Sequence, residues 1–102
     1  MGYVLAMELR KTGVYAKWLD GLRDIKARAR ILARVERLVI SGHAGDVKPV
    51  GEGVSELRIH YGPGYRVYFK QQGQELILLL AGGNKSSQSR DICMALRLAR
   101  NI

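Results

Sequence analysis

Two segments with a strand-like alternation flank a Gly-Pro-Gly sequence near the middle of the chain, and no other feature limits the possible folds as strongly. Residues 54–61 and 65–71 alternate apolar and polar side chains, which is the period of a β-strand with one buried face. Glycine reaches backbone angles that are closed to other residues, and proline fixes one backbone angle, so Gly62-Pro63-Gly64 is typical of a tight turn. The sequence therefore predicts a β-hairpin.

A turn centred on Pro63 decides which side chains of this hairpin lie opposite each other. The polar side chains then form three pairs: Arg58 with Tyr68, His60 with Arg66, and Glu56 with Lys70. For the third pair we expect a cross-strand salt bridge. One face of the hairpin is thus predicted to be apolar, whereas the other gathers two arginines, a histidine, a tyrosine and a lysine.

The rest of the chain changes between helical and strand-like periods. It predicts a strand at 4–9, helices at 13–22 and from the N-cap residue Asp24 to about 40, a loop at 42–53, a strand at 75–81 and a final helix from about 87. We therefore expect one domain, residues 1–102, of the α+β class. It should contain a small antiparallel sheet with two N-terminal helices packed on it and a C-terminal helix, in the order β-α-α-β-β-β-α.

The chain is strongly basic, since 17 Lys and Arg residues against 9 Asp and Glu residues give a net charge of +8 across 102 residues. Such a protein is attracted to polyanions, which include nucleic acids, anionic membranes and acidic protein partners. One cysteine and two histidines offer neither a disulfide framework nor the spacing of a metal site, so we expect no metal and no cofactor. The longest apolar run, 76–81, is too short to cross a bilayer, and the N-terminal residues do not resemble a signal peptide, so we expect a cytoplasmic protein.

The second predicted helix separates its basic side chains from its apolar ones. The basic side chains recur at spacings of four, four and three, so they share one face: Lys26, Arg30, Arg34 and Arg37. The apolar side chains lie opposite and are expected to pack on the sheet: Ile25, Ala29, Leu32, Val35 and Val39. Two interpretations of the basic row stay open, a solvated helix surface or a binding surface for RNA or an acidic protein segment.

Further cations are predicted to gather at the polar face of the hairpin. The apolar strand at 75–81 ends in GGNKSSQ, and its two glycines permit a sharp turn that leaves Lys85 near that face. Lys48, in the loop before the hairpin, can reach the same region. Each cation alone is compatible with an ordinary surface position, but the convergence of Arg58, Arg66 and Lys85 favours an anion-binding site.

Four segments together resemble the RelE/ParE toxin superfamily, and more narrowly the addiction module killer protein group related to RelE and HigB. With the order of the elements they cover nearly the whole chain, and they read GDVKPVG (45–51), ELRIHYGPGYRVYF (56–69), LLLAGGNKSSQ (78–88) and DI (91–92). The resemblance implies a type II toxin that is silenced by a cognate antitoxin encoded beside it, which we expect to be a helix-turn-helix protein. RelE- and HigB-type members cleave mRNA on the ribosome without a metal, whereas ParE-type members poison DNA gyrase.

The same resemblance implies roles for individual side chains. Arg66 corresponds to the residue that holds the scissile phosphate, Lys85 to the cation after the glycines of the last strand, and Arg58 to the basic residue of the preceding strand. RelE-like nucleases often carry a tyrosine or histidine shortly after the position of Lys85, but residues 86–91 read SSQSRD here. A member that only binds its antitoxin therefore stays open as an alternative, beside the nuclease and the gyrase inhibitor.

The chemistry of RNA cleavage gives such cations a task. The ribose 2′-hydroxyl attacks its own phosphate, and fixed cations stabilise the negative charge that builds up on the phosphoryl oxygens. A planar guanidinium grips two oxygens at once, which suits Arg66 and Arg58. His60 or Lys85 can transfer protons, although a partly exposed strand position is the other interpretation of His60. We expect further RNA contacts from Lys48, Tyr68 and Lys70, and antitoxin contacts from Arg30, Arg34 and Arg37.

Overall fold

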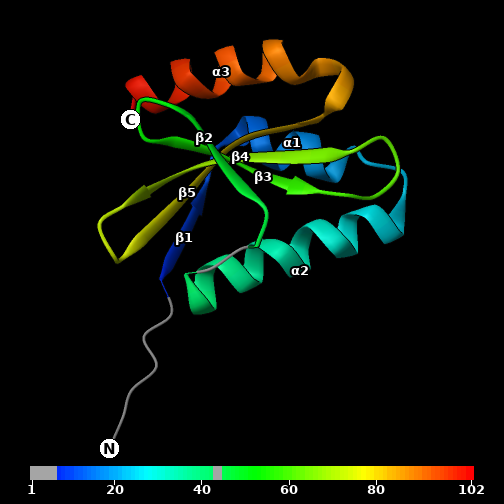
Figure 1. Cartoon of the computed structure of the whole chain (residues 1–102), viewed down its shortest axis with the longest axis horizontal. Coiled ribbons are helices and arrows are strands. Elements are labelled where there is room, and N and C mark those ends of the chain that lie inside the picture. The colour runs from blue at the N-terminus through cyan, green and yellow to red at the C-terminus, as the bar shows by residue number, and fades with distance from the viewer. Residues whose placement is uncertain (1–6, 43–44) are drawn as a thin grey trace, which may run out of the picture.

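The computed structural model describes residues 7–42 and 45–102 and places them in a five-stranded sheet flanked by helices (Figure 1). The elements in chain order are β1 (Glu8–Lys11), α1 (Gly13–Asp20), α2 (Ile25–Ser41), β2 (Val47–Gly51), β3 (Val54–Ile59), β4 (Tyr65–Gln72), β5 (Leu76–Asn84), the short 3-10 helix η1 (Lys85–Ser87) and α3 (Gln88–Arg100). The strands lie in the order β1-β5-β4-β3-β2. The predicted α+β class, with two N-terminal helices and a C-terminal helix, is confirmed. Of the strand expected at 4–9, residues 4–6 lie outside the described part.

Two features of the sheet differ from the prediction. β2 lies inside the expected loop at 42–53 and pairs antiparallel with β3. It contains Pro49 and its register shifts between Pro49 and Gly51, so the sequence carries little strand signal there. At the opposite edge β1 pairs with β5 in parallel, a direction open to two strands that no hairpin connects.

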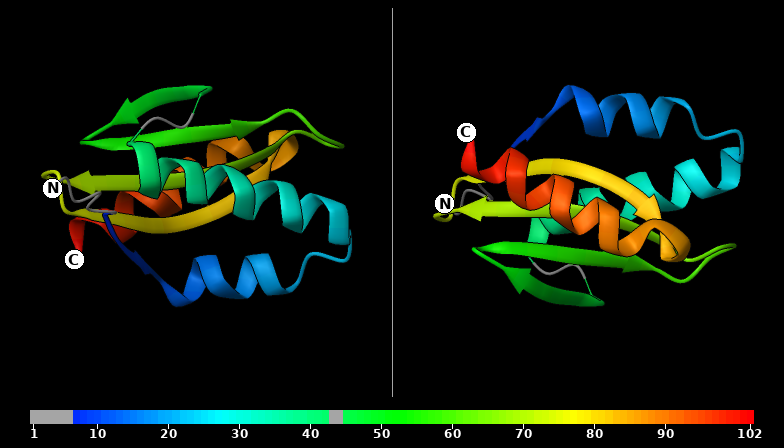
Figure 2. Two further views of the ribbon diagram at one scale, coloured as in Figure 1. Left: turned by 90° about the horizontal axis from the view of Figure 1, so that it is seen from below. Right: turned by 90° about the horizontal axis from the view of Figure 1, so that it is seen from above.

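Helices cover both faces of the sheet, with α1 and α2 on one side and α3 on the other (Figure 2). α1 and α2 close a core that includes Tyr15, Ile31 and Phe69. α3 closes a second core, in which its Ala95 packs near Tyr68 of β4. The predicted polar face of the hairpin is therefore the face that α3 partly covers.

The face that α2 turns to the sheet differs from the prediction. The buried side chains of this helix are Ala27, Ile31, Val35 and Leu38, and of the five expected there only Val35 is among them. Ile25 and Leu32 are 77% and 50% exposed. Both rows repeat at helical spacing, so periodicity could not choose between them, and the packing of the helix on the sheet decides which row is buried.

The tip of the hairpin is a tight turn, as predicted. Its two glycines adopt φ angles of 55° and 79°, which glycine tolerates far better than other residues. The Gly64 N–H donates a hydrogen bond to the Tyr61 carbonyl at 3.1 Å, so the turn spans residues 61–64. The hairpin is therefore centred on Gly62 and not on Pro63.

This turn moves the strand register by two residues from the predicted one. The observed pairs are Arg58 with Arg66, Glu56 with Tyr68, and Val54 with Lys70. The predicted pairs were therefore wrong, and His60 lies beyond the end of β3. Because side chains alternate with a period of two, a shift of two residues leaves each side chain on its predicted face.

Candidate functional site

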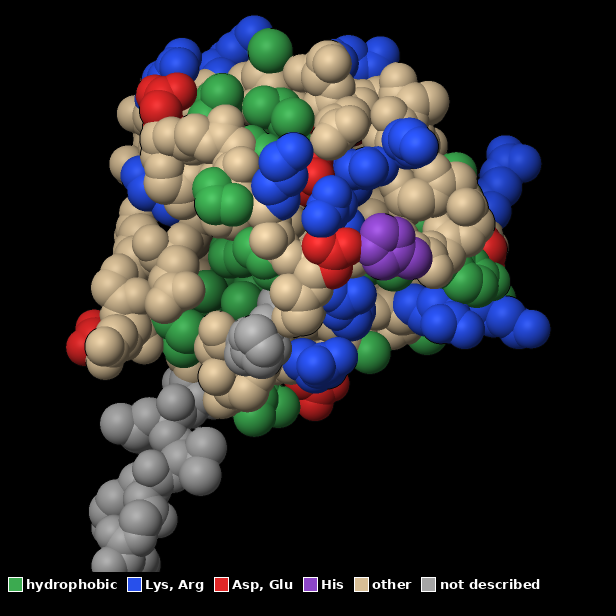
Figure 3. All heavy atoms as spheres, viewed as in Figure 1, with side chains coloured by type: hydrophobic (Ala, Val, Ile, Leu, Met, Phe, Trp, Pro, Cys, Tyr) green, Lys and Arg blue, Asp and Glu red, His purple; other side chains and the backbone are tan. Residues whose placement is uncertain are grey.

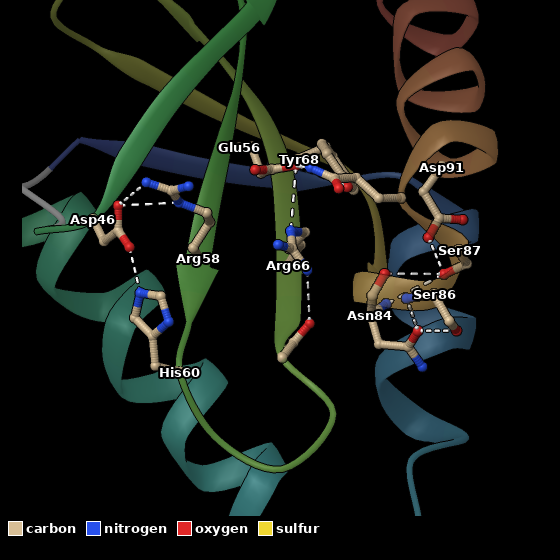
Figure 4. Close-up of polar contacts among 12 residues, drawn as sticks. Asp46, Glu56, Arg58, His60, Arg66, Tyr68, Asn84, Ser86, Ser87 and Asp91 are labelled. Atoms are coloured by element: carbon tan, nitrogen blue, oxygen red, sulfur yellow. Dashed lines mark hydrogen bonds and ion pairs between the residues drawn. The ribbon is translucent and has the colours of Figure 1, made fainter.

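Two arginines lie side by side on neighbouring strands near the hairpin tip. Arg58 of β3 is the direct partner of Arg66 of β4, and their side chains extend toward different carboxylates, Asp46 and Glu56 (Figure 4). In the view of Figure 3 several Lys and Arg side chains gather around a histidine and a few acidic side chains. The pairing places the two arginine positions directly opposite each other, which the predicted register did not.

The Arg66 side chain has polar contacts at two of its nitrogen atoms. Its Nη1 donates a hydrogen bond to the Gly64 carbonyl at 3.1 Å, and its Nε, which makes no hydrogen bond, lies 3.5 Å from Glu56 Oε2, an ion-pair distance. The side chain is 12% exposed. None of the described residues forms a hydrogen bond or ion pair with Nη2. The guanidinium thus has partners at Nε and Nη1, and Nη2 stays available to a ligand.

Lys85 lies beside Arg66 at the hairpin tip. A Cβ built on Gly64 would be 3.6 Å from Lys85 Cβ and 3.7 Å from Arg66 Nη1, so the Lys85 side chain starts close to the Arg66 guanidinium. Lys85 is exposed, and its ammonium has no polar partner in the described part of the chain. The structure therefore brings together two of the three cations that the sequence assigned to an anion site.

Arg58, the third cation, is bound to a carboxylate that sequence reasoning missed. Its Nε and Nη2 donate to Asp46 Oδ1 at 3.1 and 2.6 Å, and its backbone N–H donates to the Asp46 carbonyl at 2.9 Å. His60 Nε2 contacts Asp46 Oδ2, while the His60 side chain is 75% exposed. These contacts, first from Arg58 and then from His60, lower the pKa of Asp46. An anion that binds Arg58 must compete with Asp46.

Glu56 is a second carboxylate that the sequence did not reveal as part of the site. It is fully buried, and its Oε2 accepts hydrogen bonds from Tyr68 Oη at 3.1 Å and from Gln88 Nε2 at 2.9 Å. Tyr68, predicted to bind RNA, is also fully buried beneath α3, so this prediction was wrong. Burial, together with the neighbouring Glu56 charge, raises the pKa of Tyr68 and keeps its hydroxyl a hydrogen-bond donor.

The glycine pair of β5 positions the segment that carries Lys85. Both glycines lie inside the strand and not in a turn, which corrects the prediction. A Cβ on Gly83 would lie 1.7 Å from Asp91 Oδ2, and one on Gly82 would lie 2.1 Å from the Trp18 ring. Each glycine therefore allows an element to pack closely on the sheet, Gly82 on the α1 face and Gly83 on the α3 face.

A capped turn follows these glycines and fixes the start of α3. The Asn84 side chain accepts a hydrogen bond from the Ser86 N–H at 2.9 Å. The Ser87 hydroxyl donates to Asp91 Oδ2 one turn further along. These contacts are those of a helix-capping arrangement, and they hold the backbone of Lys85 in place.

The two other lysines expected to contact RNA lie farther out. Lys48 is exposed on β2 and pairs with Glu56, so it projects from the same face of the sheet as the two arginines. Lys70 pairs with Val54 toward the opposite end of β4 from Arg66. Of these two, Lys48 has the better position for a ligand that extends from the arginine pair.

The predicted basic row of α2 is divided between two environments. The Arg30 guanidinium lies 4.6 Å from the centre of the Tyr61 ring, and Arg34 Nη1 donates to the Arg58 carbonyl at 3.1 Å. Both side chains thus contact the hairpin from the α2 side, although Arg30 is also exposed. Arg37 is exposed.

Residues 7–42 and 45–102 contain neither a candidate metal site nor a helix that could span a membrane. No group of three or more His, Cys, Asp or Glu side chains there is placed to hold a metal ion. No helix in the same ranges has the length and apolar character needed to span a bilayer.

Comparisons with solved structures give the class of the fold. A mutant form of the E. coli toxin RelE in the free state matches with a TM-score of 0.73 over 90% of this chain and 96% of that chain, at 15% sequence identity. The toxin–antitoxin complex RelBE2 from Mycobacterium tuberculosis matches with a TM-score of 0.50 over 84% of this chain and 99% of that chain, at 16% identity. At these identities the likeness concerns the fold, which is that of a RelE-like domain.

Sequence comparison gives the family. An uncharacterized protein of Haemophilus influenzae is 43% identical over 98 residues, which are 96% of this chain and 98% of that protein. Residues 17–99 match the family described as Phage derived protein Gp49-like (DUF891). The chain belongs to this Gp49-like family, and the predicted resemblance to RelE-type proteins is confirmed at the level of the fold.

Proposed function

We propose that this protein is the toxin of a type II toxin–antitoxin module and that it is a metal-independent, ribosome-dependent mRNA endoribonuclease. The observation that carries the proposal is the Arg66 guanidinium, which has partners at Nε and Nη1, offers Nη2 to a ligand and lies beside the exposed Lys85. A phosphate at this point would contact two cations held by a strand and a capped turn. Groups on such rigid elements are positioned better than groups on mobile loops.

The proposed reaction is an internal transesterification of RNA. The 2′-oxygen forms a bond to the adjacent phosphorus and loses its proton to a base, while the bond to the 5′-oxygen breaks and that oxygen takes up a proton. The products are a 2′,3′-cyclic phosphate and a 5′-hydroxyl. Arg66 and Lys85 stabilise the charge that develops on the phosphoryl oxygens, and His60, whose ring contacts Asp46, is the candidate for proton transfer.

In this proposal Arg58 exchanges its carboxylate partner, Asp46, for the substrate phosphate. Its carboxylate partner is on the surface, with the Asp46 side chain 31% exposed, and ion pairs at such sites are weak. A substrate phosphate can therefore replace Asp46 on the guanidinium. His60 and Arg58 share this carboxylate, so the exchange would also release the histidine ring for proton transfer.

The proposed partner is a cognate antitoxin, for which a helix-turn-helix protein is the expected type. The solved RelBE2 complex is a toxin–antitoxin complex with the same fold. We assign antitoxin contact to the outer side of α2, where Arg37 is exposed beside the exposed apolar side chain of Ile40. Arg30 and Arg34 contribute at the edge of this surface while they also support the hairpin.

Mapping of mRNA 5′ ends after induced expression tests the proposed activity. We expect new 5′ ends that follow the reading frame of translated messages and vanish when initiation is blocked. Intact mRNA together with gyrase-linked, cleaved DNA would instead assign the protein to the ParE-like inhibitors. Normal growth with intact mRNA and DNA would leave antitoxin binding as its activity.

A further inference from the structure

The geometry points to Glu56 as the positioning residue of the site: its buried carboxylate holds the Arg66 guanidinium in the orientation that presents Nη2 to a phosphate. The inference rests on the proposed function in that Arg66 is taken to be the phosphate ligand. It adds a residue that touches neither substrate nor reacting atoms and acts only through Arg66.

Burial makes Glu56 dependent on its partners. The side chain is 0% exposed, and a carboxylate removed from water is unfavourable unless charges or hydrogen bonds compensate it. Oε2 accepts hydrogen bonds from the Tyr68 hydroxyl and the Gln88 amide, which are both neutral groups. Arg66 is the one cation in contact with Glu56 within the described part of the chain. The charge of Glu56 is therefore matched by that of Arg66.

The same contact limits the motion of Arg66. An arginine side chain has many rotamers, but this one has a 3.5 Å ion-pair contact from Nε to Glu56 and a hydrogen bond from Nη1 to the Gly64 carbonyl. Contacts at two of the three nitrogens define the plane of the guanidinium. The orientation of Nη2 is thus set before a ligand arrives, which is the condition for effective electrostatic stabilisation.

The Glu56 network also joins three elements at the site. Glu56 belongs to β3, and Tyr68 and Arg66 belong to β4 (Figure 4). Gln88 is the first residue of α3. A purely structural role would explain these contacts as packing of α3 on the sheet. In that case every contact of Glu56 would matter equally, and loss of the Tyr68 hydroxyl would be as harmful as loss of the Glu56 charge.

Nitrogen-15 NMR of arginine Nε–H groups separates the two roles without any activity assay. The wild-type spectrum should contain one Arg66 Nε–H signal with slow solvent exchange, identified by its absence in Arg66→Lys. We expect Glu56→Gln to lose this protection and Tyr68→Phe to keep it. If the Arg66 signal exchanges rapidly in the wild type, or stays protected in Glu56→Gln, then Glu56 does not hold the guanidinium.

Cleavage rates in a purified translation system test the consequence for catalysis. We expect Glu56→Gln to lower kcat at least tenfold with little change in KM, and to have no further effect in an Arg66→Lys background. Tyr68→Phe serves as the control for loss of stability, since it removes one Glu56 contact and leaves the charge pair intact. Equal losses in Glu56→Gln and Tyr68→Phe, or full additivity with Arg66→Lys, would overturn the inference. If the wild-type protein cleaves no RNA, the proposed function fails, and the NMR result still decides the role of Glu56.

Discussion

Arg58 and Arg66 are chemically identical, but their carboxylate partners hold them in different ways. Glu56 lies in the interior with no exposed side-chain surface, whereas the Asp46 side chain is 31% exposed. Water and salt weaken the second pair far more than the first. Arg66 is therefore a permanent element of the site, and Arg58 is one that a ligand can recruit.

The contacts of Asp46 predict a pH dependence of stability. Arg58 and His60 hold the pKa of Asp46 below its ordinary value of 3.8, so the folded state favours the ionised form. A depressed pKa stabilises the fold above the unfolded pKa, and this contribution is lost as the pH falls through the folded pKa. We expect the difference in Tm between the wild type and Asp46→Asn to be largest near neutral pH and to shrink as the pH falls below about 4. A difference that stays constant down to about pH 2 would show that Asp46 does not stabilise the fold through its charge.

At the scale of the elements, the hairpin, β5 and α3 form the frame of the site. β5 is closely packed on both faces, because the Trp18 ring lies against Gly82 and Asp91 lies against Gly83. The GGNKSSQ segment thus has two structural roles. Its glycines allow α1 and α3 to pack closely on the sheet, and the residues after them present Lys85 from a capped turn. A side chain at either glycine would separate layers that the site requires to be in contact.

The glycine that receives Trp18 gives a test of this packing. We expect Gly82→Ala to lower the free energy of unfolding by about 1–3 kcal/mol, since the added methyl group overlaps a large ring that cannot move freely. Gly13→Ala is the matched control, because no atom lies within 4 Å of the position of its Cβ. Urea unfolding measures both. Equal stabilities of the two variants would mean that the strand and the helix can separate without cost.

Local patterns in the sequence were sufficient for the elements but not for all of their spatial relations. Alternation and the Gly-Pro-Gly turn predicted the hairpin, and helical spacing predicted α2. The register depended on the hydrogen bond that closes the turn at residues 61–64, and the buried face of α2 depended on packing, so neither was predicted correctly. Asp46 was missed for the same reason, and Glu56 was assigned to Lys70 and not to Arg66. A carboxylate reveals its role only through the arginine beside it in space.

At the scale of the whole molecule, which has a net charge of +8, we propose two functional surfaces that carry cations. One lies on the α3 side around Arg66, and the other follows the outer side of α2 on the opposite side of the sheet (Figure 2). The α2 surface combines exposed cations with exposed apolar side chains, of which Ile25 and Ile40 are 77% and 53% exposed. An acidic, amphipathic antitoxin segment would complement both properties.

Charge reversal on α2 tests this assignment. We expect Arg37→Glu to weaken binding of the cognate antitoxin about tenfold at low salt, and the effect to diminish as salt is added. Arg97→Glu is the control, since Arg97 is exposed on α3 across the sheet. Isothermal titration calorimetry gives both affinities. Equal affinities for the two variants would place the antitoxin elsewhere.

The rate of mRNA cleavage by Arg66→Lys in a purified translation system tests most directly whether Arg66 is the phosphate ligand of a nuclease. The substitution keeps the positive charge beside Glu56 but removes the planar guanidinium that presents Nη2 to a phosphate. We expect a loss of about 100- to 1,000-fold, with a thermal melt close to that of the wild type and with Arg97→Lys unaffected. Cleavage by Arg66→Lys at the wild-type rate would contradict the assignment of Arg66 as the phosphate ligand.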